Sequence, residues 1–304
     1  MSNNKHSIAL FGEVLIDQFP DGQQILGGAP FNVAWHLQAF GQSPSFISKI
    51  GTDQIGTDIQ SAMKNWGMSH ANLQVDTIYP TGKVVIEINN GEPSYAILDQ
   101  QAYDFINAKQ LDLSKAYDVI YHGSLALRHT DSAQALKTLL SHHKGKIFLD
   151  VNLRAPWWQI ESVEQSLHNA DWVKLNADEL SQLTTMSSQP LKDTMQEFLN
   201  MYHLDVLIVT SGEQGATALS KTGEYIEVKP VININVIDTV GAGDAFAAVL
   251  LLGLLANWPL SITMIRAQSF ASASVTQQGA TFKDISFYQP FIQEWLLGFS
   301  FKYQ

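Results

Sequence analysis

The sequence contains no cysteine among its 304 residues. Disulfides, thiolate catalysis and cysteine-bound zinc are therefore excluded. Positive charge is also scarce, because 18 Lys and Arg residues stand against 29 Asp and Glu residues and leave a formal net charge of −11. Nucleic acids and anionic membrane surfaces are bound through clustered Lys and Arg, so the composition predicts that neither is a partner.

Long hydrophobic runs are missing as well. The most apolar segment, Ala245 to Ala256, is too short to span a bilayer, which needs roughly 20 apolar residues, and it is expected to be a buried core helix. The first residues, Met1 to His6, are polar and lack the pattern of a signal peptide, so we expect a cytoplasmic protein. No linker or repeat interrupts the chain, which favours a single domain over residues 1–304.

Short β-branched runs alternate with helical stretches through much of the sequence. Examples are Asp118 to Tyr121, Ser132 to Leu140, Ile147 to Val151, Val163 to Asn169 and Trp172 to Leu175. This alternation predicts an α/β fold with three layers, in which helices cover both faces of a mostly parallel sheet. Ligands of such sheets bind beyond the carboxyl ends of the strands, where Asn152, Asn176 and Thr210 are expected.

Two segments depart from this alternation, at about residues 17–26 and 72–103. Within the second, Val84, Ile86 and Ile88 alternate with their neighbours, and the sequence Asn-Asn-Gly-Glu at 89–92 is a hairpin signal. We expect the two segments to form a small inserted β lid.

A turn of small residues precedes the apolar helix. Val231 to Ile237 is expected to be extended, so Gly241, Ala242 and Gly243 fall where the helix begins. Amides at a helix start have no intrahelical partner and can bind an anion, such as a transferring phosphoryl group. Asp244 follows as a candidate general base. The alternative is a tight turn in which Asp244 only stabilises the helix dipole.

A second motif, Gly27-Gly28-Ala29-Pro30-Phe31-Asn32-Val33-Ala34 followed by Gly41 and Gly51, resembles the first signature of the ribokinase-like (PfkB) sugar kinases. The stretch from Asp238 to Ala248 resembles their second signature. The resemblance covers nearly the whole chain, since the segment Ile8 to Asp17 looks like the first strand of the family and Asn176-Ala177-Asp178-Glu179 is similar to its Asn-x-x-Glu motif. Within the family, Phe11 to Asp17 followed by Gly-Gly-Ala-Pro-x-Asn is most similar to the fructokinase branch.

This resemblance implies a ribokinase-like fold and an ATP-dependent sugar kinase that converts fructose to fructose 6-phosphate. It also implies MgATP as phosphoryl donor, K⁺ as a further cofactor, and a lid that covers the sugar and can join two copies into a homodimer. Ribose, 2-keto-3-deoxygluconate and adenosine remain alternative substrates. A non-catalytic sugar or nucleotide sensor on the same fold is the alternative from another class.

The residues expected to bind the sugar come from three parts of the chain. Asp17 can accept hydrogen bonds from two hydroxyls, and Asn32 lies four residues after Gly28, on the same helical face. Asn152 and Arg154 alternate with Asp150, which would place all three on one face of a strand end. Arg154 can clamp an oxyanion with its guanidinium; an ion pair with Asp150 is the alternative.

The residues expected to bind the nucleotide follow other strands. The resemblance makes Asn176 and Glu179 organisers of Mg²⁺ through water, although Glu179 could instead only stabilise the start of a helix. The turn after Thr210, with Gly212 and Gly215, is suited to backbone contacts with ATP. The resemblance further places Gly279 over the adenine and a monovalent cation at Asp238. His36 is expected to be a core residue.

Overall fold

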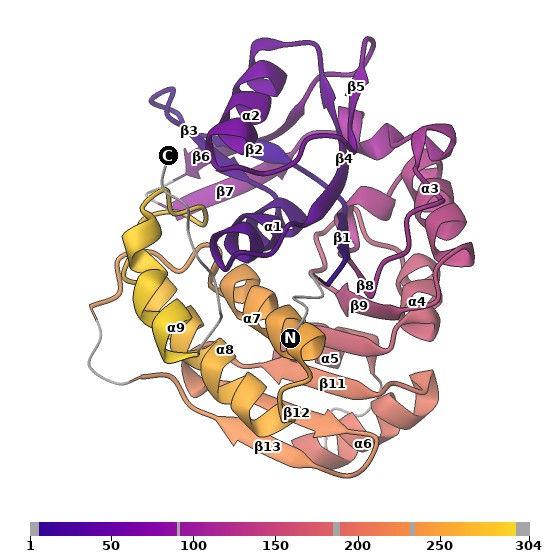
Figure 1. Cartoon of the computed structure of the whole chain (residues 1–304), viewed down its shortest axis with the longest axis vertical. Coiled ribbons are helices and arrows are strands. Elements are labelled where there is room, and N and C mark those ends of the chain that lie inside the picture. The colour runs from indigo at the N-terminus through magenta and orange to yellow at the C-terminus, as the bar shows by residue number, and fades with distance from the viewer. Residues whose placement is uncertain (1–5, 90–91, 185–188, 232–234, 296–304) are drawn as a thin grey trace.

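The computed structural model describes residues 6–89, 92–184, 189–231 and 235–295. Two helical layers enclose a large sheet, and a smaller sheet lies at one end of the molecule (Figure 1). The predicted three-layer α/β fold with a mostly parallel sheet is thereby confirmed. No described helix is long and apolar enough to cross a membrane.

The central sheet has nine strands in the order β13-β12-β11-β10-β9-β8-β1-β4-β5. All neighbours from β11 to β5 are parallel, whereas β12 is antiparallel to both β11 and β13. The strands are β1 Ile8–Phe11, β4 Ser45–Gly51, β5 Leu73–Asp76, β8 Val119–His122, β9 Lys146–Asp150, β10 Trp172–Asn176, β11 Val206–Thr210, β12 Ala216–Ser220 and β13 Tyr225–Val228. Helices cover both faces, so the inner strands are apolar almost throughout.

The two helical layers differ in their origin along the chain (Figure 1). One layer contains α1 Ala29–Ala39, α2 Gln54–Asn65, α7 Ala242–Ala256, α8 Leu260–Ser274 and α9 Gln289–Glu294. The other contains α3 Thr130–Ser141, α4 Ile160–Asn169, α5 Ala177–Leu183 and α6 Leu191–Tyr202. Helix α7 packs between α1 and α8 and is apolar on all sides, which explains why its sequence is one continuous hydrophobic run.

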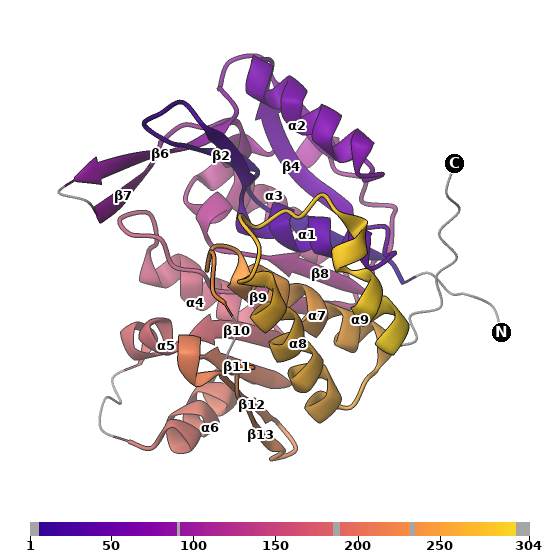
Figure 2. The ribbon, with the colours of Figure 1, turned by 90° about the vertical axis from the view of Figure 1, so that its left-hand side faces the viewer.

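The smaller sheet has four strands in the order β3-β2-β6-β7 and projects from the edge of the main body (Figure 2). Its strands are β2 Leu15–Gln18, β3 Gln24–Gly27, β6 Gly82–Asn89 and β7 Glu92–Ile97. Strands β2 and β6 are parallel, and the other two pairs are antiparallel. The centre of the hairpin signal, residues 90–91, lies outside the described residues.

Two local expectations were wrong, and a third is not tested. The opening segment Ile8 to Asp17 is not one strand, because the chain leaves the central sheet after Phe11, where the Gly12 N–H bonds to Ile47 O at 3.1 Å, and enters the smaller sheet at Leu15. Leu73–Asp76, inside the predicted lid, is instead the edge strand of the central sheet, paired with β4. In the segment from Val231 to Ile237, the described residues 231 and 235–237 belong to no strand, and 232–234 lie outside the described part.

Candidate active site

A cavity of about 610 Å³ opens where the parallel strands end, between the central sheet and the smaller sheet. Most of the residues predicted as site residues line it: Asp17, Gly28, Asn32, Asn152, Arg154, Asn176, Glu179, Thr210, Asp238, Gly241, Gly243, Asp244 and Gly279. Three predicted residues, Ala242, Gly212 and Gly215, are not among its lining. Segments far apart in the sequence therefore meet at one edge of the sheet, as the strand-end argument predicts.

The start of α7 forms one wall of this cavity. Gly241 is the N-cap residue with φ 78, and Asp244 lies in the first turn. A side chain at Gly241 would collide with Ala280, so the turn requires glycine. The Ala242 N–H bonds weakly to Thr239 O at 3.3 Å, whereas the N–H groups of Gly241 and Gly243 have no acceptor among the described residues. Two amides are thus available for an anion.

Asp244 is held by the first glycine motif. Gly28 is the N-cap of α1, and Asn32, buried in the first turn of that helix, donates from Nδ2 to Asp244 Oδ2 at 2.8 Å. Burial raises the pKa of Asp244 to about 6, although the Asn32 hydrogen bond acts in the opposite direction. The carboxyl therefore titrates close to neutral pH, as expected for a general base.

A buried ion pair lies at the bottom of the cavity and was missed by the sequence reasoning. Lys174 Nζ is 2.8 Å and 2.9 Å from the two carboxylate oxygens of Asp150, and the Tyr121 hydroxyl donates to Asp150 Oδ2 at 3.1 Å. The signal was a lysine between Val173 and Leu175 in an apolar strand. Such a position demands a charged partner, because an isolated buried ammonium is costly.

The alternative pairing of Asp150 with Arg154 is wrong, since Asp150 pairs with Lys174. The strand β9 ends at Asp150, and Asn152 adopts a left-handed conformation with φ 47, so the predicted alternation on one strand face does not hold. Arg154 is exposed, and its Nη1 donates to Leu153 O at 3.0 Å. No carboxylate lies within 4 Å of its guanidinium in the part of the chain described here.

Asn176 and Glu179 form a capping box at the start of α5. Asn176 Oδ1 accepts from the Glu179 N–H at 2.8 Å, and Glu179 Oε2 accepts from the Asn176 N–H at 2.8 Å. The other oxygen, Oε1, accepts from the Leu153 N–H at 2.7 Å, which ties the loop after β9 to α5. Burial raises the pKa of Glu179, while the backbone N–H of Asn176 opposes this shift. Glu179 therefore stabilises the start of α5, which was the alternative expectation for it. Its side chain also lines the cavity.

Asp238 joins the loop before α7 to the loop after α8. Its Oδ1 accepts from the Val240 N–H and its Oδ2 from the Gly279 N–H, both at 2.9 Å. Thr210 lies at the end of β11 and lines the same end of the cavity, whereas Gly212 and Gly215 lie beyond it in the turn before β12.

Two further carboxyls face the cavity from the segment Phe11 to Asp17. Asp17 on β2 has its pKa raised to about 6 by burial. Glu13, between β1 and β2, is 3% exposed, and its Oε2 has no hydrogen-bond partner among the described residues. Burial raises the pKa of Glu13 to about 7. The sequence reasoning gave Glu13 no role, although a carboxyl at a strand end beside a glycine turn is a signal for one. His36, by contrast, is a core residue as expected, with its Nδ1 2.9 Å from the Tyr288 hydroxyl.

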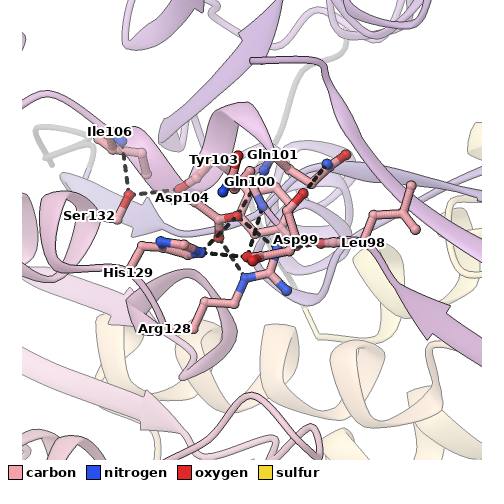
Figure 3. A network of polar contacts seen from close by, with 10 residues as sticks. All are labelled: Leu98, Asp99, Gln100, Gln101, Tyr103, Asp104, Ile106, Arg128, His129 and Ser132. Carbon is pink, nitrogen blue, oxygen red and sulfur yellow. Dashed lines mark hydrogen bonds and ion pairs between the residues drawn. The ribbon is translucent and has the colours of Figure 1, made fainter. Parts of the chain in front are cut away.

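The chain leaves the smaller sheet through a polar network (Figure 3). Arg128 Nε and Nη2 donate to the two oxygens of Asp104 at 2.7 Å and 2.8 Å, and Nη2 also donates to Leu98 O at 2.5 Å. His129 Nε2 lies 2.6 Å from Asp99 Oδ1. Because Arg128 bonds to both oxygens of Asp104 and to Leu98 O, this cluster fastens the end of β7 to the start of α3.

Comparison with known protein sequences gives one family for this chain. Residues 4–286 match the family described as pfkB family carbohydrate kinase. A fructokinase of Salmonella typhimurium is 27% identical over 293 residues, which cover 89% of this chain and 94% of the relative. A fructokinase of Escherichia coli is 29% identical over 259 residues, which cover 81% and 83% of the two chains.

Solved structures share the fold. A fructokinase from Xylella fastidiosa with bound ATP superposes with a TM-score of 0.84 at 22% identity and covers 96% of this chain and 99% of that one. An aminoimidazole riboside kinase from Salmonella enterica superposes with a TM-score of 0.81 at 24% identity and covers 96% and 100%. Together with the match over nearly the whole length, these findings show that the chain belongs to the pfkB family of carbohydrate kinases.

Proposed function

We propose that the chain is an ATP-dependent fructokinase that transfers the γ-phosphate of ATP to the O6 hydroxyl of fructose. The observation that carries the proposal is the position of Asp244, which faces the cavity at the start of α7 beside two free amides and is hydrogen-bonded to Asn32. Fructokinases are also prominent among the relatives.

In the proposed reaction, Asp244 takes the proton of the sugar hydroxyl while the hydroxyl oxygen forms a bond to the γ-phosphorus. The bond between the γ-phosphorus and the β–γ bridging oxygen breaks, and its electron pair leaves with ADP. The amides of the Gly241 to Gly243 turn, of which those of Gly241 and Gly243 are free, stabilise the charge on the transferring group. Positioning and electrostatics supply most of the rate enhancement in such reactions.

The sugar would be bound at the end of the cavity formed by the first glycine motif. Asp17 and Asn32 offer polar atoms for hydroxyl groups, and Gly28, which has no room for a side chain against the backbone of Glu13, lines the same cavity. Asn152 and Arg154 line the same cavity, and the guanidinium of Arg154 can bind an oxygen of the sugar or of the phosphate.

The residues fit a magnesium ion only indirectly. Each carboxylate oxygen of Glu179 already accepts a backbone N–H, yet each keeps a lone pair, so Glu179 and Asn176 could hold a hydrated ion through water. When bound, the ion would neutralise part of the charge of the ATP phosphates. Thr210 and Gly279 would bind other parts of ATP, and a monovalent cation would lie against Asp238, whose two oxygens likewise keep lone pairs.

We prefer a sugar to a nucleoside because fructokinases are prominent among the relatives. A nucleoside would need an aromatic lid; Phe31 and Tyr103 are fully buried in the core, whereas Phe19 and Tyr95 line the cavity. A keto acid such as 2-keto-3-deoxygluconate would need more than one free cation near its carboxylate. Among the described lining residues, Arg154 and Lys174 are the only cations, and Lys174 is already paired.

The smaller sheet would act as a lid that excludes water from the phosphoryl group during transfer. We further propose that the chain of 304 residues forms a single domain. The smaller sheet would join two copies of this chain into a homodimer. Light scattering at micromolar concentration tests this, and a monomer would contradict it.

The test of the proposed function is ADP release from MgATP in the presence of fructose, ribose, 2-keto-3-deoxygluconate, adenosine or aminoimidazole riboside, each with and without K⁺. We expect fructose to give the highest kcat/KM. Turnover with another member of the panel would replace the proposed substrate. Binding of sugar and nucleotide without any turnover would indicate a non-catalytic sensor.

The matched variant for this test is Asp244→Asn, which keeps the shape of the side chain but removes the base. We expect turnover to fall by a factor of about 10²–10⁴, the usual contribution of a general base, with much smaller changes in nucleotide binding. Near-normal turnover of this variant would remove Asp244 from its proposed role.

A further inference from the structure

Lys174 lies directly below the turn that begins α7. It belongs to β10, its side chain points to the sheet face that carries α7, and it is 7% exposed. Its ammonium group forms a buried ion pair with Asp150, with Nζ 2.8 Å from Oδ1.

The ammonium group borders the place where an anion would bind. A Cβ atom added to Gly243 would lie 3.6 Å from Lys174 Nζ, which is ordinary van der Waals contact. Apart from the two chain neighbours of Gly243, no other described side chain comes within 4 Å of that Cβ position. Two of the three N–H groups of the ammonium are directed to the oxygens of Asp150, and the third has no acceptor among the described residues. That third donor is available to a ligand oxygen near the Gly243 amide.

We propose that Lys174 is a catalytic residue that donates a hydrogen bond to a non-bridging oxygen of the γ-phosphate during transfer. This inference rests on the proposed kinase function and assigns to its anion site a cation that the glycine turn alone does not provide. Lys174 keeps its proton throughout, because the proton of the sugar hydroxyl goes to Asp244. Asp150, oriented by the Tyr121 hydroxyl, acts as a positioning residue that holds the ammonium in place.

A structural role for Lys174 makes a different prediction. If Lys174 only neutralises Asp150, then Lys174→Met should destabilise the protein, and the double variant Lys174→Met/Asp150→Asn should recover both stability and activity, because no uncompensated charge remains buried. If Lys174 contacts the phosphate, the double variant recovers stability but not turnover.

The test compares binding of Mg²⁺ with AMP-PNP and Mg²⁺ with ADP by calorimetry, in the full chain and without sugar. We expect Lys174→Met and the double variant to bind AMP-PNP about 10- to 100-fold more weakly, as for the loss of one hydrogen bond to a charged group, and to bind ADP nearly normally. The matched control is Lys146→Met, which removes an ion-paired lysine of the neighbouring strand at the opposite end of the sheet.

Equal effects on both nucleotides, or no effect on either, would overturn the role of Lys174 while leaving the kinase function intact. Recovery of turnover in the double variant would do the same. Failure of the unmodified chain to bind either nucleotide would overturn the proposed function and this inference together.

Discussion

Asn32 Nδ2 donates a 2.8 Å hydrogen bond to Asp244 Oδ2 and so joins two helices whose contacting residues are 212 positions apart. Each residue belongs to one of the two glycine motifs. The first motif therefore has a role beyond the sugar site proposed for it, because it also orients the carboxyl that the second motif presents. The hydrogen bond also lowers the pKa of Asp244 against the effect of burial.

The activity of the unmodified chain should depend on the protonation of Asp244. Burial raises the pKa of this carboxyl to about 6, and a general base acts only when deprotonated. We expect kcat/KM with the preferred sugar to rise with pH through a midpoint near 6 and to level off above it. A flat profile across this range would contradict the assignment of Asp244 as the base.

Replacing Asn32 by alanine should move that midpoint. Asn32→Ala removes a hydrogen bond that favours the charged carboxylate, so the pKa of Asp244 should rise and the profile should shift to higher pH. The pH profile separates this effect from simple loss of sugar binding, which would lower kcat/KM equally at every pH. Gln38→Ala on the same helix, at a partly exposed position, should leave the profile unchanged.

Glu13 should lower stability at high pH. Its pKa is raised by burial to about 7 from an ordinary value of 4.5, so its stabilising contribution is present below pH 4.5 and is lost as the pH rises through 7. Glu13→Gln should therefore be more stable than the unmodified chain at pH 8, by about 1–3 kcal/mol, and should show no gain at pH 4. Urea unfolding measures both, with the exposed Glu87→Gln as control.

Gly28 should tolerate no side chain. It has φ 105, and an added Cβ would lie 2.7 Å from Glu13 O, so Gly28→Ala combines backbone strain with a clash. Gly22 also has a left-handed φ of 88, but a Cβ there meets open space. We expect Gly22→Ala to cost about 1 kcal/mol from strain alone and Gly28→Ala to cost clearly more. Equal thermal stability of the two variants would show that the backbone around Glu13 yields to the clash.

Arg128 should fasten the smaller sheet more strongly than a lysine could. Its guanidinium reaches the two oxygens of Asp104 from two different nitrogens, Nε and Nη2, and Nη2 also bonds to Leu98 O, a planar fork that the single nitrogen of a lysine does not reproduce (Figure 3). Arg128→Lys should destabilise the protein by about 1–3 kcal/mol and raise KM for the sugar more than it lowers kcat. The exposed ion pair of Lys221 with Asp205 offers the control, since Lys221→Met should change stability by less than about 1 kcal/mol.

Sequence patterns predicted the parts of this protein that depend on local geometry. The βα alternation gave the parallel sheet, and the small residues before an apolar run located the start of α7 and the position of Asp244. Strand ends placed Asn152, Asn176 and Thr210 at one edge, since the carboxyl ends of parallel strands meet there. Each of these inferences needs only the periodicity of an element and the point where it ends.

Features that depend on contacts between distant segments were not predictable in the same way. The left-handed conformation of Asn152 broke the expected alternation, and the partner of Asp150 proved to be Lys174, a residue on another strand. Leu73–Asp76 has the pattern of a lid strand but pairs with β4, because pairing depends on which edge of which sheet is free. A pattern in one segment does not determine its partner.

The place of α7 in the fold has a consequence for the synthesis of the protein. All described strands of both sheets lie before residue 229, and only afterwards does the chain return from the sheet edge at β13 to pack α7 against α1. The strands of both sheets are thus synthesised before Asp244, and α7, which fills the middle of one helical layer, follows them. A chain that ended before residue 242 would lack Asp244 and would also leave the apolar residues of α1 and of the sheet beneath it uncovered.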